Sequence, residues 1–247
     1  MDIDIKGDII EDENKMIYEW FGWNYTTARN VINALKKADG EAVNLKINSP
    51  GGSVFAASEI YTELMNYKGD VNIQILGLAA SAASVIAMAG RSKMSSTALM
   101  MVHNTSTGGV SGDYRVMEHT AEFLKTANQT IASAYVRKSG MSEDEALALM
   151  DRETWLTAEK AKELKLIDEV MFEENNIINN QSFKGLQNSF STIPQNILEQ
   201  LEMLQKNNIN QNQPKNDNKN DNQVDFLIKE KAKAQAKLNL LKLGGNI

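Results

Sequence analysis

The chain has 247 residues, of which 42% are hydrophobic and 23% charged, and its formal net charge is −6. This composition supplies one sizeable core, and the negative balance argues against a protein that mainly coats nucleic acid. Because the chain contains no cysteine, disulfides, thiol nucleophiles and cysteine-ligated metal sites are excluded.

Strand-like and helix-like hydrophobic patterns alternate along residues 1–172. Strands are predicted at 3–10, 42–48, 71–76, 98–102 and 167–170. Helices are predicted at 26–37, 53–67, 81–89, 113–139, 142–150 and 157–164, with Thr26, Ser142 and Thr157 as N-caps and Gly140 closing the longest helix. This alternation predicts an α/β fold with largely parallel strand pairing.

The composition changes near residue 173, and Asn and Gln become abundant. Residues 207–223 contain no aromatic residue and too little apolar surface to offset the entropy of ordering, so they are predicted to be a disordered linker. Amphipathic helical patterns flank this linker at 194–206 and 225–243. We therefore expect a folded domain over 1–172 and a low-complexity tail over 173–247.

The N-terminus is acidic and lacks the basic start and apolar core of a signal peptide. The longest apolar run, Leu78 to Ala89, is shorter than the about 20 residues that a membrane span needs. The expected protein is soluble and cytoplasmic, with no membrane partner.

Two loops that follow predicted strands carry unusual small residues. The first, Asn48–Gly52, places two glycines after a proline, so its backbone N–H groups could approach a ligand closely; an ordinary turn is the alternative. In the second, Gly77–Ser84, Ser81 stands at a helix start among small neighbours, which suits a nucleophile beside an oxyanion site. Close packing of this helix would require the same small residues.

His103 directly follows the predicted strand at 98–102, on the sheet edge where α/β proteins usually place ligands. The other histidine, His119, lies in the middle of a predicted helix and is expected to be structural. A serine followed by a histidine leaves a third, acidic member to find, and Asp151 and Glu153 are the candidates. Chain order does not decide between them, because catalytic triads are recognised by geometry.

Four ordered motifs then identify a resemblance: NSPGGS, GLAASAAS, MMVHN followed by Gly108-Gly109, and ETWLTAEKAKELKLIDEV. Across residues 3–171 the chain resembles the ClpP serine peptidases, the proteolytic subunits of the Clp protease. The resemblance implies a ClpP/crotonase fold, in which ββα units form a spiral with an added strand–helix handle. It further implies peptide or protein substrates, no cofactor or metal, and a homo-oligomer of stacked heptameric rings.

The resemblance also assigns roles to residues. Ser81 would be the nucleophile and His103 the general base, and the N–H groups of Gly52 and Ala82 would form the oxyanion hole. Gly108 and Gly109 would bind substrate as an added strand.

The family's acid stands two residues before the aromatic of an aromatic-Leu-Ser/Thr-Ala run, here Trp155 to Ala158, which indicates Glu153. The usual family residue is Asp. Asp151 stays an alternative, because residues two apart in an extended segment face the same side.

Two features differ from ATPase-partnered members of the family: no segment is expected before the first strand, and an Asn-rich tail follows the domain. Both resemble the ClpP-like head maturation proteases of tailed phages, which cleave capsid and scaffold proteins inside the prohead. The expected enzyme is therefore an ATP-independent serine endopeptidase of the host cytoplasm or the assembling prohead.

Three alternatives remain. The chain could be an ATPase-partnered housekeeping peptidase or a catalytically degenerate ClpP-like assembly protein. It could also be a crotonase-type acyl-CoA enzyme with a carboxylate acid/base, a reading that gives no role to the pairing of Ser81 with His103.

Overall fold

A computed structural model describes residues 1–172 of the chain. The predicted tail at 173–247, with its linker at 207–223 and its helices at 194–206 and 225–243, lies outside the described residues. The fold, the site and the contacts below all concern residues 1–172.

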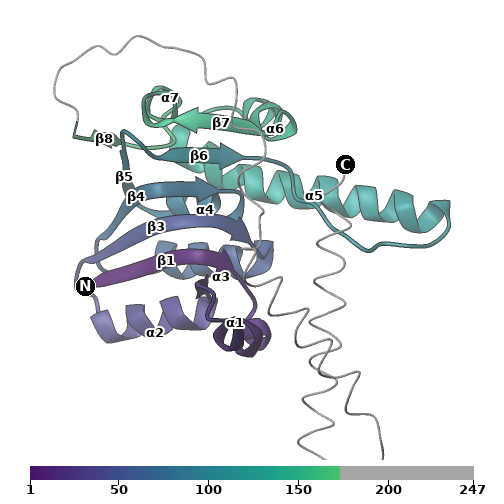
Figure 1. Cartoon of the computed structure of the whole chain (residues 1–247). Coiled ribbons are helices and arrows are strands. Elements are labelled where there is room, and N and C mark those ends of the chain that lie inside the picture. Colours follow the sequence, from purple (N-terminus) through teal and green to yellow (C-terminus); the bar gives the residue numbers. More distant parts are fainter. Residues whose placement is uncertain (173–247) are drawn as a thin grey trace, which may run out of the picture. The chain divides into compact units, whose positions relative to one another are not determined.

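A largely parallel sheet forms the centre of this part of the chain (Figure 1). Its main path runs β2-β1-β3-β4-β5-β8, and every neighbouring pair on it is parallel. These strands are β1 (Asp2–Ile9), β2 (Tyr25–Thr26), β3 (Val43–Gly52), β4 (Val71–Ala80), β5 (Arg91–Ser95) and β8 (Glu169–Met171). Off this path, β6 (Leu99–Val102) pairs in parallel with the end of β4, and β7 (Thr154–Thr157) pairs antiparallel with β6. The predicted α/β class with a parallel sheet is confirmed.

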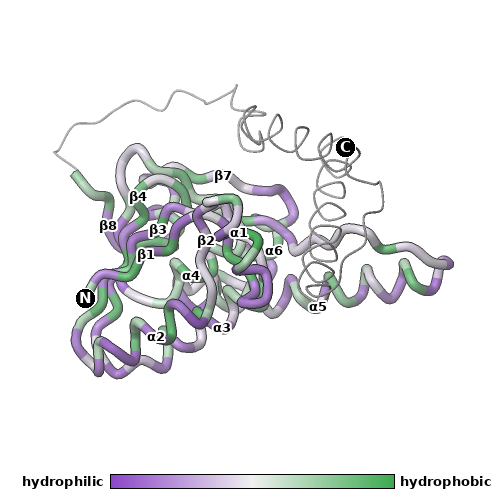
Figure 2. Tube along the Cα trace, turned by 60° about the horizontal axis from the view of Figure 1, so that its bottom comes forward, coloured by the Kyte–Doolittle hydropathy of each residue, from purple (hydrophilic) through white to green (hydrophobic). Residues whose placement is uncertain are grey.

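The helices between these strands follow the predicted order. They are α1 (Lys15–Phe21), α2 (Ala28–Ala38), α3 (Val54–Met65), α4 (Ala82–Ile86), α5 (Tyr114–Ser139), α6 (Glu143–Asp151) and α7 (Ala158–Glu163), with 3-10 turns η1 (Asp12–Asn14) and η2 (Ala87–Ala89). Helices α2, α3 and α4 lie on one side of the sheet in both views (Figures 1 and 2). Helix α1 and strands β2, β5 and β7 were not predicted from the sequence.

The hydrophobic core lies between the sheet and these helices. Alternate residues of the central strands point into it, and Ile5, Leu45, Ile47 and Ile75 are completely buried there. Ile60 of α3 packs in the same core. Period-two alternation thus determines which face of each strand meets the helices.

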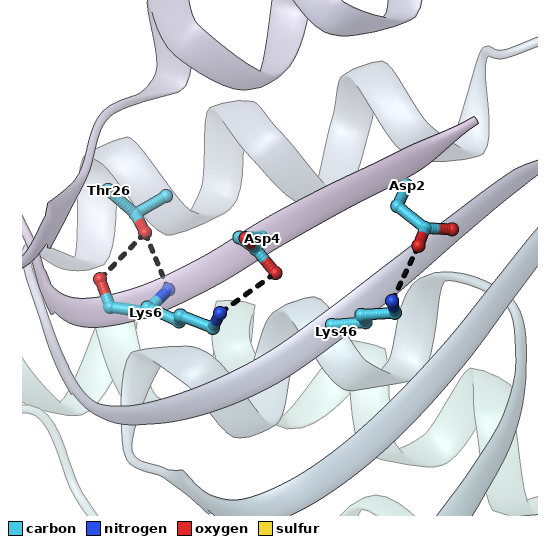
Figure 3. Close-up of polar contacts among 5 residues, drawn as sticks. All are labelled: Asp2, Asp4, Lys6, Thr26 and Lys46. Atoms are coloured by element: carbon cyan, nitrogen blue, oxygen red, sulfur yellow. Dashed lines mark hydrogen bonds and ion pairs between the residues drawn. The ribbon is translucent and has the colours of Figure 1, made fainter.

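The opposite face of β1 and β3 is polar, as Figure 3 shows in close-up. Lys46 Nζ lies 2.5 Å from Asp2 Oδ2, and Lys6 Nζ lies 3.2 Å from Asp4 Oδ1. Thr26 Oγ1 accepts from the N–H of Lys6 and donates to its carbonyl oxygen. Such exposed ion pairs contribute little to stability. This face is therefore a solvated surface that adds little to the free energy of folding.

Side-chain caps determine where several helices begin. Ser53, Ser142 and Thr157 cap α3, α6 and α7, and Ser142 forms the predicted capping box with Glu145. The prediction of Thr26 as the cap of α2 was wrong by one residue. Thr27 caps this helix by accepting the N–H of Asn30, because the Thr26 backbone is used for pairing with β1.

Asp113 caps the start of helix α5, and Gly140, whose φ of 78° lies in the left-handed region, caps its end. The N-terminal half of α5 extends away from the sheet (Figure 1). Residues 103–112, which connect β6 to α5, form no strand, so the expected strand–helix handle is not confirmed. Among the described residues, no helix is both long and apolar enough to cross a membrane.

Candidate active site

The loops Asn48–Gly52 and Gly77–Ser84 and the loop that begins at His103 meet at one edge of the sheet. In the parallel register, Ser49 of β3 pairs with Ala79 of β4, and Ala80 pairs with Met101 of β6. The chain therefore leaves the sheet at Gly52, Ser81 and His103 on the same side, the edge where α/β folds gather ligand-binding residues.

Ser81 occupies a sharp bend between β4 and α4. Its φ of 54° and ψ of −127° lie outside the regions that L-residues commonly adopt, a conformation that costs about 1–3 kcal/mol. The bend is held in part by the Ser81 N–H, which donates to the Met101 carbonyl oxygen at 2.9 Å. A strand-to-helix bend of this kind presents the serine Oγ at the top of the sheet, as the nucleophile elbow does in α/β-hydrolases.

His103 follows β6 and faces the bend. Its Nε2 atom lies 2.7 Å from Ser81 Oγ, within hydrogen-bond distance. Burial of the ring lowers the pKa of His103 below its usual 6.5, and the carboxylate of Glu153 opposes this by raising it. The ring is therefore neutral at pH 7, and its Nε2 can accept the serine proton.

Two asparagines hold the segment after His103. Asn104 Nδ2 donates to Asp151 Oδ1 at 2.8 Å. Asn128 of α5 accepts from both the N–H and the Oγ1 of Thr105, each at 2.7 Å. Sequence analysis missed Asn104 and Asn128, because an asparagine in a loop or on a helix surface carries no distinguishing pattern.

The two candidate acids are placed differently. Asp151 is the last residue of α6 and is the partner of Asn104. Glu153 has a left-handed φ of 46°, its N–H donates to the Met150 carbonyl oxygen at 3.0 Å, and its carboxylate acts on His103 through charge. The assumption of an extended segment over 151–153 was wrong, because a helix ends there. The end of α6 lies between the two residues, and the charge of Glu153 raises the pKa of His103.

The backbone of Gly51 lies directly against Ser81. A Cβ at Gly51 would come within 2.7 Å of the Ala80 carbonyl oxygen and of Ser81 Cβ, and its φ is 101°. Only glycine fits this position. Ser49 Oγ accepts the Gly51 N–H at 3.1 Å and donates to the Gly7 carbonyl oxygen at 2.6 Å. Ser49 thus anchors this turn, a role that sequence analysis missed.

The two predicted oxyanion donors border this bend. Gly52 follows Gly51, and a Cβ on Gly52 would come within 2.1 Å of the Ile9 carbonyl oxygen, so its backbone packs closely on β1. Ala82 is the first residue of α4, where backbone N–H groups have no partner within the helix. The structure therefore brings Gly52 and Ala82 to the same end of the sheet as Ser81.

The remaining site candidates lie elsewhere. Gly108 and Gly109 are exposed in the loop before α5, and His119 is exposed on α5 itself. Within residues 1–172, no group of three His, Asp or Glu side chains could hold a metal ion.

Comparison with known proteins identifies relatives of the whole site region. The model of the Clp protease family matches residues 12–174. ATP-dependent Clp protease proteolytic subunit 1 of Chlamydia abortus is 31% identical over 163 residues, which cover 61% of this chain and 84% of the relative. The corresponding proteolytic subunit of Bacteroides fragilis is 37% identical over 139 residues, covering 55% of this chain and 66% of the relative. Subunit 1 of Chlamydia pneumoniae is 31% identical over 182 residues, covering 69% and 95%.

Proposed function

The chain belongs to the Clp protease family, and we propose that it is a serine endopeptidase with Ser81 as nucleophile and His103 as general base. The observation that carries this proposal is the 2.7 Å separation of Ser81 Oγ and His103 Nε2 at the strained bend. A neutral histidine in contact with a serine at such a bend is the arrangement that acyl transfer requires.

The proposed reaction proceeds in two stages. His103 Nε2 takes the proton from Ser81 Oγ as the oxygen attacks the substrate carbonyl, and the N–H groups of Gly52 and Ala82 stabilise the oxyanion. His103 then donates that proton to the leaving amine, so an acyl-enzyme forms on Ser81. Water, deprotonated by His103, hydrolyses this ester and regenerates the serine.

We assign the third role to Glu153. Its negative charge raises the pKa of His103 and would stabilise the imidazolium that forms during each proton transfer. Asp151 is the second candidate, and its hydrogen bond with Asn104 supports a role in holding the loop instead.

Peptide hydrolysis by this machinery needs neither cofactor nor ATP, because water is the only co-substrate of either stage. We therefore propose ATP-independent activity on flexible substrates. Substrate would add as an extended strand near Gly108 and Gly109, and the subunits would assemble into rings, stacked heptamers by the family resemblance.

For the physiological substrate we propose capsid or scaffold proteins of a tailed phage, cleaved during head maturation. The support is the sequence resemblance, including the Asn-rich segment at 207–223. The named relatives, which are ATP-dependent Clp proteolytic subunits, support the alternative of a housekeeping peptidase. The crotonase-type and degenerate alternatives leave the contact between Ser81 and His103 without a purpose.

Labelling with a fluorophosphonate serine probe tests the proposed activity. We expect a covalent adduct on Ser81, identified by mass spectrometry of the full-length protein, and absence of that adduct would contradict the serine peptidase. Incubation with the products of neighbouring genes should then yield defined fragments without ATP. Degradation of a stably folded protein only when a Clp ATPase is added would favour the housekeeping alternative.

A further inference from the structure

Two buried hydroxyl groups are hydrogen-bonded in series beneath the bend at Ser81. Ser84, in α4, has an exposed fraction of 0%, and Tyr135, in α5, one of 2%. Ser84 Oγ lies 2.6 Å from the carbonyl oxygen of Ser81 and 2.8 Å from Tyr135 Oη. The three groups form a continuous hydrogen-bonded chain from α5 to the nucleophile's own backbone.

The direction of this chain follows from counting protons. The Ser81 carbonyl can only accept, so the single proton of Ser84 Oγ must point to it. Tyr135 must then donate to Ser84 Oγ. Burial raises the pKa of Tyr135 to about 12, so its hydroxyl keeps this proton at neutral pH.

The carbonyl that receives this chain belongs to the peptide that joins Ser81 to Ala82. A trans peptide is planar, so its C=O and its N–H point in opposite directions and turn together. The Ser81 oxygen also accepts the Ser84 N–H at 2.9 Å. Two donors on one end of the plane therefore determine the direction of the Ala82 N–H at the other end.

We propose that Ser84 and Tyr135 are positioning residues that orient the Ala82 N–H toward the oxyanion. This inference rests on the proposed serine peptidase function, in which that N–H is an oxyanion donor. Ser81 has an uncommon ψ of −127°, so its peptide needs external restraint to keep this orientation. The Ser84–Tyr135 pair provides that restraint from a long helix packed beneath α4.

The need of the Ser81 carbonyl oxygen for a hydrogen-bond donor does not explain the presence of the Ser84 and Tyr135 hydroxyl groups. The Ser84 N–H already supplies the Ser81 oxygen with a donor, as in any helical turn. An alanine and a phenylalanine would fill the same buried space without the desolvation cost of two hydroxyls. The Ser84 and Tyr135 hydroxyl groups therefore help to orient the Ser81–Ala82 peptide, whose carbonyl oxygen already has one donor.

The variants Ser84→Ala and Tyr135→Phe test the proposal, measured as kcat and KM on a peptide substrate of the full-length protein. Loss of an oxyanion donor costs about 10²- to 10³-fold in kcat, so misorientation of one donor should cost about 10-fold, with KM within about twofold. Ser84→Ala should have the larger effect, because Ser84 contacts the carbonyl directly. The double variant should be no worse than Ser84→Ala, because Tyr135 acts through Ser84.

A second readout separates orientation from general structural damage. A peptide boronate forms a tetrahedral adduct with the serine and occupies the oxyanion hole, so its affinity should fall in proportion to kcat/KM. Tyr67→Phe and Ser92→Ala are matched controls. The Tyr67 hydroxyl accepts from the Gly40 N–H and donates to the Glu41 carbonyl oxygen, and Ser92 is buried beside Asp168. Both controls should keep parent kcat and boronate affinity.

The outcomes are distinguishable. Parent kcat in both Ser84→Ala and Tyr135→Phe would overturn the inference, as would a loss of kcat with unchanged boronate affinity or a double variant with multiplied losses. Both substitutions preserve volume, and thermal unfolding of each variant verifies that the protein is folded. Failure of the parent to react with the fluorophosphonate probe would instead overturn the proposed function, and the inference with it.

Discussion

His103 Nε2 and Ser81 Oγ are 2.7 Å apart, although one residue follows β6 and the other follows β4. The contact depends on the parallel pairing of these two strands, in which Ala80 lies opposite Met101. A change of register by one residue would reverse the direction of every side chain on one strand and would separate the pair. Strand register is thus the structural basis of the proposed chemistry.

Ser81→Ala should abolish fluorophosphonate labelling and lower kcat/KM by about 10³-fold or more, because binding and the oxyanion hole alone remain. Ser84 should not take over as nucleophile, because it is completely buried. Peptide turnover and mass spectrometry of the labelled protein provide the measurement. Labelling that moves to Ser84, or retained activity, would refute the assignment of Ser81.

Glu153→Gln should lower kcat by about 10²- to 10⁴-fold, because loss of the acid removes stabilisation of the imidazolium. Asp151→Asn is the matched control: it removes a carboxylate two residues away but keeps an oxygen that can accept the Asn104 N–H. We expect it to have nearly parent activity. The reverse result, with Asp151→Asn inactive and Glu153→Gln active, would make Asp151 the acid.

The pH dependence of kcat/KM should follow the protonation of His103. Protonated imidazole cannot act as a base, so activity should be lost as the pH falls through the pKa of His103, which burial holds below 6.5. Glu153 raises that pKa, so the residual activity of Glu153→Gln should have its acidic limb at a lower pH. A limb that moves to higher pH in this variant would contradict the charge interaction.

Gly51→Ala should lower activity by at least about 10²-fold. Its Cβ would overlap the Ala80 carbonyl oxygen and push the backbone, including the adjacent oxyanion donor Gly52, away from Ser81. Loss of an oxyanion donor typically costs this much. Gly140→Ala is the control for backbone strain alone. Its φ is 78°, and a Cβ there would meet nothing within 4 Å. Activity per folded molecule should be unchanged in Gly140→Ala; equal losses in the two variants would show that strain, rather than the overlap, is responsible.

A chain that ends at Phe172 should fold and retain peptide hydrolysis. The last strand, β8, pairs with β5 up to Met171, and Val170 is buried in the core, so residues 1–172 contain a complete sheet edge. Circular dichroism, thermal unfolding and peptide turnover provide the measurement. In the full chain, limited proteolysis should first cut within the predicted linker at 207–223. Failure of the shortened chain to fold would contradict the predicted domain boundary.

The sequence by itself determined the features that depend on near neighbours. The caps at Ser142 and Thr157 were predicted because each depends on a side chain and an N–H three residues away. The strand order of the motifs also indicated that Ser81 and His103 would share an edge of a parallel sheet. Strand β5 was missed because its polar residues, such as Arg91 and Lys93, hide the alternation.

Only the tertiary structure revealed the hydrogen bond between Asp151 and Asn104, the charge effect of Glu153 on His103 and the hydrogen bond from Ser84 to the Ser81 carbonyl oxygen. The directions of Asp151 and Glu153 depend on where α6 ends, and a sequence pattern locates helix ends poorly. Ser84 and Tyr135 are 51 positions apart, and their contact exists only because α5 packs beneath α4. Hydrogen bonds between distant segments depend on the packing of the whole domain, and no local pattern of side chains encodes them.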